Sequence, residues 1–349
     1  LVALPGLLLA LGRIAAAREV LDTLVRHQRR GLLPFRLPSS EAGPLPSAPD
    51  ATLWLFEAVR ELVERVGVDD EFVRRRLFPF LCRAFARLRS GRRYGVWMTA
   101  EGLLANSLDG VPLTWMDARV GDRIVTLRRG LAVEQQALWT RAADLVERLA
   151  AAYGFASLAT AAARTAARAR AAFRERFWCN ETEYPFDCIS EGSGTAESWA
   201  DASVRPNALI ALAVDPSLFD GWQSAAIIGR VRDDLLTPRG LRSLAPREPG
   251  YRGHYEGGPV ERDGSYHQGT AWTHLLGCYV RANLRLSPQD PGLRQELVRC
   301  IEGALDDGLV LGQIAQLADG EAPHRFRGAT AQAWAVGELL RALVVDLGC

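Results

Sequence analysis

The 349-residue chain contains no lysine, so all 42 of its basic residues are arginine. We interpret this absence as a matter of codon composition. Against 41 acidic residues the net charge is only +1, which predicts no attraction to nucleic acid or to a membrane surface. Long apolar runs are also lacking. The apolar start, residues 1–17, is interrupted by Pro5-Gly6 and Arg13, so we predict neither a signal peptide nor a membrane span, and we expect the sequence to begin inside a domain.

Paired cysteines and the common cofactor motifs are absent as well. None of the six cysteines forms a CxxC pair, which argues against a zinc site and favours buried thiols in a cytosolic, hence cytoplasmic, protein. There is no P-loop, no GxSxG and no GxGxxG. His267 is a candidate base or metal ligand, but no second ligand follows one helical turn later, so a hydrogen-bonding histidine is favoured. The sequence therefore predicts no cofactor and no metal.

Most of the chain shows the hydrophobic periodicity of helices. Apolar residues recur every three to four positions, and Asp50 is a candidate N-cap for one of these segments. The pattern predicts about eleven helices, two of them short and within the first segment. The predicted segments are 7–28, from Asp50 to about 63, 70–89, 133–153, 156–177, 208–214, 221–236, 269–286, 290–309 and 331–347.

These helices come in pairs, and long Gly-rich loops join the pairs. No strand–helix alternation indicates a parallel sheet. The predicted loops are 32–49, 90–129, 178–207, 237–268 and 311–330. We therefore predict an all-α (α/α)6 toroid that forms a single domain over residues 1–349. In such a toroid the loops at one end gather into a pocket, and loops on a rigid scaffold commonly carry function.

The predicted loop 90–129 contains an acid next to a large aromatic ring. Trp115 precedes Asp117 by two residues, and Asp122 follows Gly121. Desolvation beside an apolar ring favours the neutral form of a carboxyl, which is what a general acid needs. The alternative is that Asp117 caps a helix or occupies a turn.

The loops are also rich in aromatic, amide and arginine side chains. A sugar is recognised by flat apolar faces and by planar polar groups. The alternative is that such residues tie the loops to the helices through buried polar networks. The candidate sugar-binding residues are Trp97, Trp115, Asp122, Arg205, Asn207, Tyr251, Arg252, Tyr266, His267, Gln268, Trp272 and Trp334.

Eight segments in order resemble the amylo-α-1,6-glucosidase domain of glycogen debranching enzymes. The resemblance implies an (α/α)6 toroid and metal-free, inverting hydrolysis of an α-1,6-linked glucosyl stub on branched α-glucan, with Asp117 as the general acid. An aromatic-Trp-Gly-Arg-Asp segment that precedes the first of these pieces in the family does not occur here. The eight segments are Leu4-Pro-Gly-Leu-Leu8, Asp50-Ala-Thr-Leu-Trp54, Leu113-Thr-Trp-Met-Asp117, Arg205-Pro-Asn207, Leu236-Thr-Pro-Arg-Gly-Leu-Arg242, Pro249-Gly-Tyr-Arg-Gly253, Tyr266-His-Gln-Gly-Thr-Ala-Trp272 and Ala331-Gln-Ala-Trp334.

One position departs from the family at a chemically decisive place. Where the family usually has a general-base glutamate, in Gly-Ser-Ile-Ser-Glu-Ile-Phe-Asp-Gly, this chain has Gln316, in Gly312-Gln-Ile-Ala-Gln-Leu-Ala-Asp-Gly320. An inverting glycosidase needs two carboxyl groups, and losing the base costs on the order of 10²–10⁴ in rate.

Three explanations for Gln316 stay open at this point. It is an engineered replacement, it marks a natural member that has lost hydrolysis, or Asp319 or Glu321 serves as the base in a shifted loop. The function is accordingly either glycoside hydrolysis or non-catalytic α-glucan binding on the same fold. A different toroid enzyme would need an Asp-rich or zinc motif, which the sequence lacks.

Overall fold

The computed structural model describes residues 1–34, 49–108, 110–111, 113–190, 198–305 and 312–349. Most of the predicted loop 32–49 lies outside these residues. So do the end of the predicted helix 290–309, the first residue of the predicted loop 311–330 and a part of the predicted loop 178–207. Among the described residues, no helix is both long enough and apolar enough to cross a membrane.

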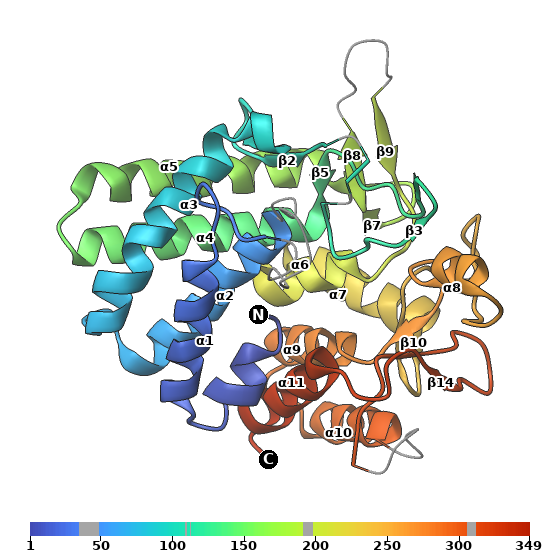
Figure 1. Cartoon of the computed structure of the whole chain (residues 1–349). Coiled ribbons are helices and arrows are strands. Elements are labelled where there is room, and N and C mark those ends of the chain that lie inside the picture. The colour runs from blue at the N-terminus through green and yellow to red at the C-terminus, as the bar shows by residue number, and fades with distance from the viewer. Residues whose placement is uncertain (35–48, 109, 112, 191–197, 306–311) are drawn as a thin grey trace.

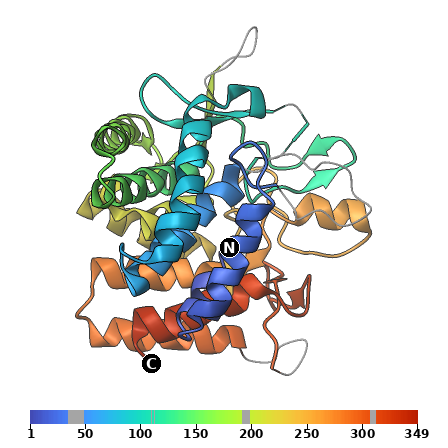
Figure 2. The same ribbon diagram turned by 60° about the vertical axis from the view of Figure 1, so that its left-hand side comes forward.

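Six inner elements contact one another in cyclic order, counted over the part of the chain that the structure describes. The ring closes because the last element packs against the first, and the blue and red ends of the chain accordingly lie side by side in Figure 2. The inner elements are η1 (Pro5–Leu9), α2 (Pro49–Val66), α4 (Val133–Ala152), α6 (Asn207–Val214), α9 (Leu275–Leu286) and α11 (Ala333–Arg341).

Each inner element is followed in the chain by an outer helix that packs against it. This alternation confirms the predicted all-α class and the (α/α)6 toroid. The outer elements are α1 (Ile14–Arg26), α3 (Phe78–Ser90), α5 (Ala156–Arg176), α7 (Gly221–Arg230) with its extension η5 (Val231–Leu235), α10 (Pro291–Leu305) and η6 (Ala342–Leu347).

Burial follows the position of a helix in the ring. All eight residues of the inner helix α6 are buried, as expected for a helix that is apolar on every side. The outer helix α10 buries only one stripe, Leu297, Ile301 and Ala304, whose spacing of three to four residues places them on one face. The apolar pattern of a segment therefore indicates that it is a helix and also whether that helix lies in the inner or the outer ring.

Two predicted helices have different boundaries in the structure. The helix predicted over 70–89 is divided into a wide turn, η2 (Val73–Leu77), and α3. Pro79 explains the division, because its ring displaces the carbonyl four residues earlier and it has no N–H to donate. The helix predicted over 269–286 begins only at Leu275. Gly269 has a φ of 141°, outside the helical region, and Ala271–Trp272 forms a strand instead.

Short antiparallel strands occupy the loops at one end of the ring, which lies toward the right and top of Figure 1. The largest sheet has five strands: β10 (Leu236–Thr237), β11 (Gly240–Arg242), β12 (Ala271–Trp272), β13 (Leu317–Ala318) and β14 (Phe326–Arg327). Because Trp272 pairs with Leu317, this sheet holds the segment just after the predicted loop 237–268 against the predicted loop 311–330. The helix α8 (Pro259–Ser265) lies within the predicted loop 237–268.

The remaining strands form four smaller antiparallel groups. The predicted loop 90–129 contains two hairpins, and the predicted loop 178–207 contributes a third hairpin and two strands of a three-stranded sheet. The hairpins are β1 (Val96–Met98) with β2 (Leu104–Asn106), β3 (Arg119–Val120) with β4 (Arg123–Ile124), and β6 (Trp178–Cys179) with β7 (Tyr184–Pro185). The sheet is β5 (Leu131–Ala132), β8 (Cys188–Ser190) and β9 (Trp199–Asp201).

Candidate active site

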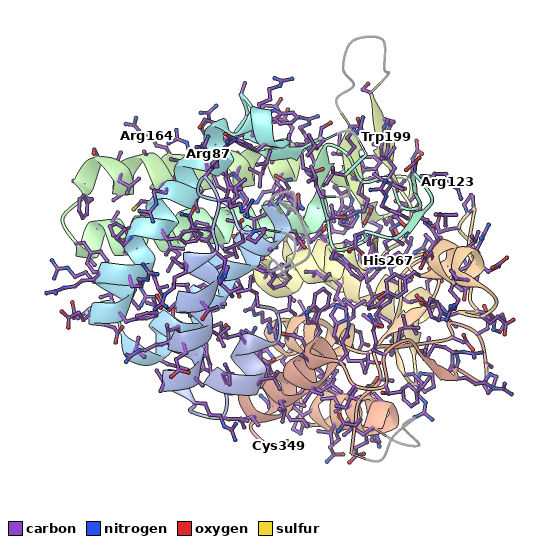
Figure 3. The ribbon with its side chains drawn as sticks, viewed as in Figure 1. Arg87, Arg123, Arg164, Trp199, His267 and Cys349 are labelled. Carbon is purple, nitrogen blue, oxygen red and sulfur yellow. The ribbon has the colours of Figure 1, made fainter. Side chains whose placement is uncertain are left out.

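A pocket of about 360 Å³ lies where the loops meet the inner ring. This volume is within the usual range of small-molecule sites. His267, one of its residues, is labelled in Figure 3 at the end of the ring where the strands lie. Seven predicted site residues line the pocket: Trp115, Asp117, Tyr266, His267, Trp272, Gln316 and Trp334. The other lining residues are Leu1, Val2, Asp50, Ala51, Trp54, Thr114 and Gln332.

Trp115 is held rigidly by polar and aromatic contacts. Its indole N–H donates to Oδ1 of Asn207 at 2.8 Å. The ring lies edge-on to His267 and Trp272, with centroid distances of 5.1 and 5.4 Å. Such edge-to-face pairs are favourable arrangements of aromatic rings. The loop that carries Asp117 is therefore fixed two residues before the acid.

Asp117 reaches the pocket beside a buried histidine. Its side chain is 31% exposed, and Oδ1 lies 3.7 Å from Nε2 of His267. The His267 ring stacks on Trp272 with centroids 5.0 Å apart and an interplanar angle of 12°. Burial lowers the pKa of His267, although Asp117 acts in the opposite direction. Asp117 therefore faces a neutral imidazole at neutral pH.

Gln316 stands at the edge of the five-stranded sheet, and both polar atoms of its amide are engaged. The Nε2 group donates to the Tyr266 hydroxyl at 2.5 Å, and Oε1 accepts from the backbone N–H of Ala329 at 3.1 Å. Burial raises the pKa of Tyr266, so this residue stays a neutral phenol that can also donate. The same two groups could therefore both donate to a carboxylate at position 316.

The two alternative bases are paired elsewhere. Asp319 accepts from the backbone N–H of Tyr255 at 2.8 Å and forms an ion pair with Arg327 at 2.9 Å. Glu321 accepts from the Tyr251 hydroxyl at 2.8 Å. Neither carboxylate is among the residues that line the pocket. The structure therefore gives no support to a shifted loop that presents one of them.

Seven predicted site residues do not line the pocket, and four of them have other contacts or are exposed to solvent. Asp122 is fully exposed in the tight turn between β3 and β4, where Gly121 has a φ of 60°. Trp97 lies on β1 with the Arg92 guanidinium 4.7 Å from its ring centroid. Tyr251 bonds to Glu321, and Arg252 is exposed. The side chains of these residues contact other groups or lie in solvent, and their role in sugar binding stays a prediction.

Three further predicted residues lie behind the pocket and support it. Buried Arg205 donates to the carbonyl of His267 at 2.8 Å and to Oε1 of Gln268 at 3.1 Å. Asn207 holds Trp115 and donates to Oδ1 of Asp187 at 2.7 Å. These residues position the aromatic wall. None of the three is among the lining residues, and their direct contact with sugar hydroxyls stays a prediction.

The sequence reasoning missed seven lining residues, and four of these have polar or aromatic side chains: Asp50, Trp54, Thr114 and Gln332. A signal for the first two was available. Residues four apart share a helix face, and Asp50 and Trp54 combine an acid and an aromatic ring at that spacing. Gln332 had no such signal, because it follows a loop whose path only the tertiary structure determines.

Among the described residues, four of the thirteen buried side-chain atoms that lack a hydrogen-bond partner belong to residues that line this pocket. Within the described part of the chain, Oδ1 of Asp50, both ring nitrogens of His267 and Oε1 of Gln332 have no hydrogen-bond partner. Buried polar groups in proteins are nearly always paired, and these exceptions belong to residues around the pocket that also holds Asp117 and Gln316. This pocket is therefore the candidate active site.

The sequence profile described as Amylo-alpha-1,6-glucosidase matches residues 1–341. The chain belongs to the amylo-alpha-1,6-glucosidase family. This confirms the family resemblance noted in the sequence, and family membership indicates a glycoside-hydrolase type of function. The position of Asp117 in the pocket is compatible with the acid role that the resemblance implies.

One curated relative and one solved structure extend this comparison. A stretch of 94 residues is 33% identical to the glycogen debranching enzyme of Saccharomyces cerevisiae. That stretch covers 25% of this chain and only 6% of the yeast enzyme. The crystal structure of an uncharacterized conserved protein from Thermus thermophilus matches with a TM-score of 0.66 and 16% identity, over 97% of this chain and 90% of that one. At this identity the likeness shows the fold alone.

Proposed function

We propose that the pocket binds the terminal glucosyl unit at α-1,6 branch points of glycogen-like α-glucan. Asp117 protonates the glycosidic oxygen, and Gln316 occupies the place of the base. The observation that supports this most directly is that Asp117 and Gln316 line one pocket together with Trp115, Tyr266 and Trp272. The aromatic rings supply apolar faces for a sugar ring, and the acid supplies the proton.

Gln316 decides how fast this site can turn over. In inverting hydrolysis one carboxyl protonates the leaving oxygen while a second takes a proton from the attacking water. The amide of Gln316 can hold a water molecule at Oε1, but it has no basic lone pair with which to accept the proton. We therefore expect the native chain to bind glucan well. We expect it to hydrolyse glucan more slowly than a site with a carboxylate base at this position, by a factor on the order of 10²–10⁴.

The decisive experiment is the substitution Gln316→Glu. The Tyr266 hydroxyl and the Ala329 N–H, which now contact the amide, can both donate to the new carboxylate. Glucose release from a singly branched limit dextrin should rise by about 10²–10⁴. A matched control is Gln313→Glu, the same chemical change at an exposed residue of the same loop, which should leave release at the native level. Absence of release from folded Gln316→Glu protein would reject the hydrolase assignment.

A non-catalytic glucan-binding role is the second candidate. It is favoured by one observation, the engagement of both Nε2 and Oε1 of Gln316 by protein groups, which suits a stable residue rather than a proton acceptor. Calorimetry with maltooligosaccharides separates the candidates. Binding by both forms without glucose release, even from Gln316→Glu, supports the binding role.

A further inference from the structure

Asp50 is the second carboxyl among the residues that line the pocket. It lies in the first turn of α2, one helical turn before Trp54, which also lines the pocket. The residue is half-buried, but its Oδ1 is fully buried and has no hydrogen-bond partner among the described residues. A buried carboxyl oxygen without a partner disfavours the charged form, and the half-buried side chain as a whole lines a ligand-sized pocket.

The surroundings of Asp50 disfavour a negative charge. Arg128 donates to both oxygens of Glu134, at 2.6 and 2.5 Å, and to Oδ2 of Asp187 at 2.6 Å. One cation is therefore shared by two buried carboxylates, and Asp117 adds a further acidic group on the pocket side. Ionising Asp50 would add one more negative charge to a region whose positive charge is already bound.

These effects have a definite direction. Burial, then the charge of Glu134, raises the pKa of Asp50 to about 8, with a smaller contribution from Asp117. Arg128 and a hydrogen bond from Gln135 act in the opposite direction. The amino-terminal end of α2 does too, but a helix dipole shifts a pKa by at most about 1.5 units. The carboxyl of Asp50 therefore keeps its proton close to neutral pH.

We propose that Asp50 is a specificity-determining residue that acts as a neutral carboxylic acid and donates a hydrogen bond to a hydroxyl of the bound glucosyl unit. A protonated carboxyl offers one donor and one acceptor, which matches a hydroxyl group that both accepts and donates. An ionised carboxylate would offer acceptors alone. This inference rests on the proposed function, since it assigns Asp50 to the same sugar.

The first test is the pH dependence of maltooligosaccharide binding, measured by calorimetry. Affinity scales with the fraction of protein in the binding-competent form, so the native chain should bind about tenfold more weakly at pH 9 than at pH 7. Asp50→Asn keeps a donor and an acceptor, so it should bind within about threefold of the native chain at pH 7 and lose the pH dependence. Asp50→Ala should bind about 3–10-fold more weakly at pH 7.

Two controls isolate Asp50 in this test. Asp122→Asn makes the same chemical change in an exposed turn and should behave as the native chain. Leu1 also lines the pocket, and burial lowers the pKa of its amino group. Any pH dependence that survives in Asp50→Asn belongs to such other groups. Native binding that is flat from pH 7 to 9, or an Asp50→Asn variant that keeps the native slope, overturns the assignment.

A second measurement detects the protonation state of Asp50 in the absence of sugar. An infrared difference spectrum between pH 7 and pH 9.5 should show the C=O band of a protonated carboxylic acid at the lower pH, and Asp50→Asn should lack it. If the band is absent from the native chain, a neutral Asp50 is ruled out whatever the chain binds. If the band is present but no glucan binds at any pH, the proposed function fails and the hydrogen bond to sugar fails with it.

Discussion

The carboxyl groups that lie in the helical ring and the one that lies at the pocket differ in how they are paired. Within the helical ring, Glu57 pairs with Arg60 at 2.7 Å and Glu61 with Arg341 at 2.7 Å. At the pocket, by contrast, Asp50 keeps an oxygen without a partner among the described residues. Both groups come from inner-ring helices. The ring also contains unpaired buried atoms, among them Nε of Arg341 and of Arg281, so neither a buried charge nor an unpaired atom marks a functional site by itself. The cavity beside Asp50 is what distinguishes the pocket.

The largest expected effect is on the rate of glucose release and concerns Asp117, the proposed acid of the pocket. In a chain that carries Gln316→Glu, the further change Asp117→Asn should lower glucose release by about 10²–10⁴, because the leaving oxygen loses its proton donor. Glucose release from the limit dextrin measures this. Asp122→Asn in the same background is the matched control and should retain full release, since that side chain is exposed in a turn. Equal activity of the two variants would remove Asp117 from the acid role.

A change in the ring should affect stability and not glucan binding. Arg281 pairs with Glu338 at 3.2 Å and with Asp346 at 3.5 Å, and its side chain is 6% exposed. Arg281→Met would leave two acids without this cation, which should lower the free energy of unfolding by about 3–5 kcal/mol. Urea denaturation measures the loss.

The control for this prediction is Arg148→Met. Arg148 forms an ion pair with Glu64 in which both side chains are nearly half exposed, so its removal should cost at most about 1 kcal/mol. Glucan affinity should be unchanged in both variants. A loss below about 1 kcal/mol for Arg281→Met would show that the ring pairs are not needed for the fold.

The two regions should also respond to pH with opposite signs. Burial raises the pKa of Glu57, but the hydrogen bonds and charge of Arg60 outweigh it and lower that pKa from 4.5 to about 2. The stabilisation is therefore present above pH 4.5 and lost as pH falls toward 2, about 3 kcal/mol in all. Glu57→Gln should be destabilised above pH 4.5 and equal to the native chain near pH 2.

Asp50 should show the reverse dependence of stability on pH. Its pKa is raised from 3.8 to about 8 on folding, so stability falls as pH rises between these values. Asp50→Asn should therefore be more stable than the native chain at pH 8, by roughly 1–3 kcal/mol after allowance for pocket water, and no more stable below pH 4. Urea denaturation over a pH series measures both variants. If the stabilities of the two variants relative to the native chain change with pH in the same direction, the contrast between ring and pocket is wrong.

The smallest expected effect belongs to Arg252, a predicted sugar-binding residue that is exposed and outside the pocket lining. Arg252→Ala should change the free energy of unfolding by no more than about 0.5 kcal/mol and leave glucan affinity unchanged. Calorimetry and urea denaturation check the two parts. A tenfold loss of affinity would extend the site beyond the pocket described above.

Much of the fold was predictable because it depends on local periodicity. Every helix pair of the ring corresponds to a predicted apolar pattern, and the deviations have local causes such as Pro79 and Gly269. The site was predictable only in part. Trp115 and Asp117 are close in sequence, so their chemistry could be inferred there, and the family resemblance pointed to Gln316, far along the chain.

What the sequence determined by itself was the alternation of inner and outer helices and the identity of the groups available for chemistry. The tertiary structure decided which of those groups face the pocket. Arg205 and Asn207 turn inward to hold the aromatic wall, Asp122 turns to solvent, and Asp50 turns to the cavity. The physical reason is that the direction of a loop side chain depends on partners far away in the chain, whereas helical periodicity depends on neighbours within one or two turns.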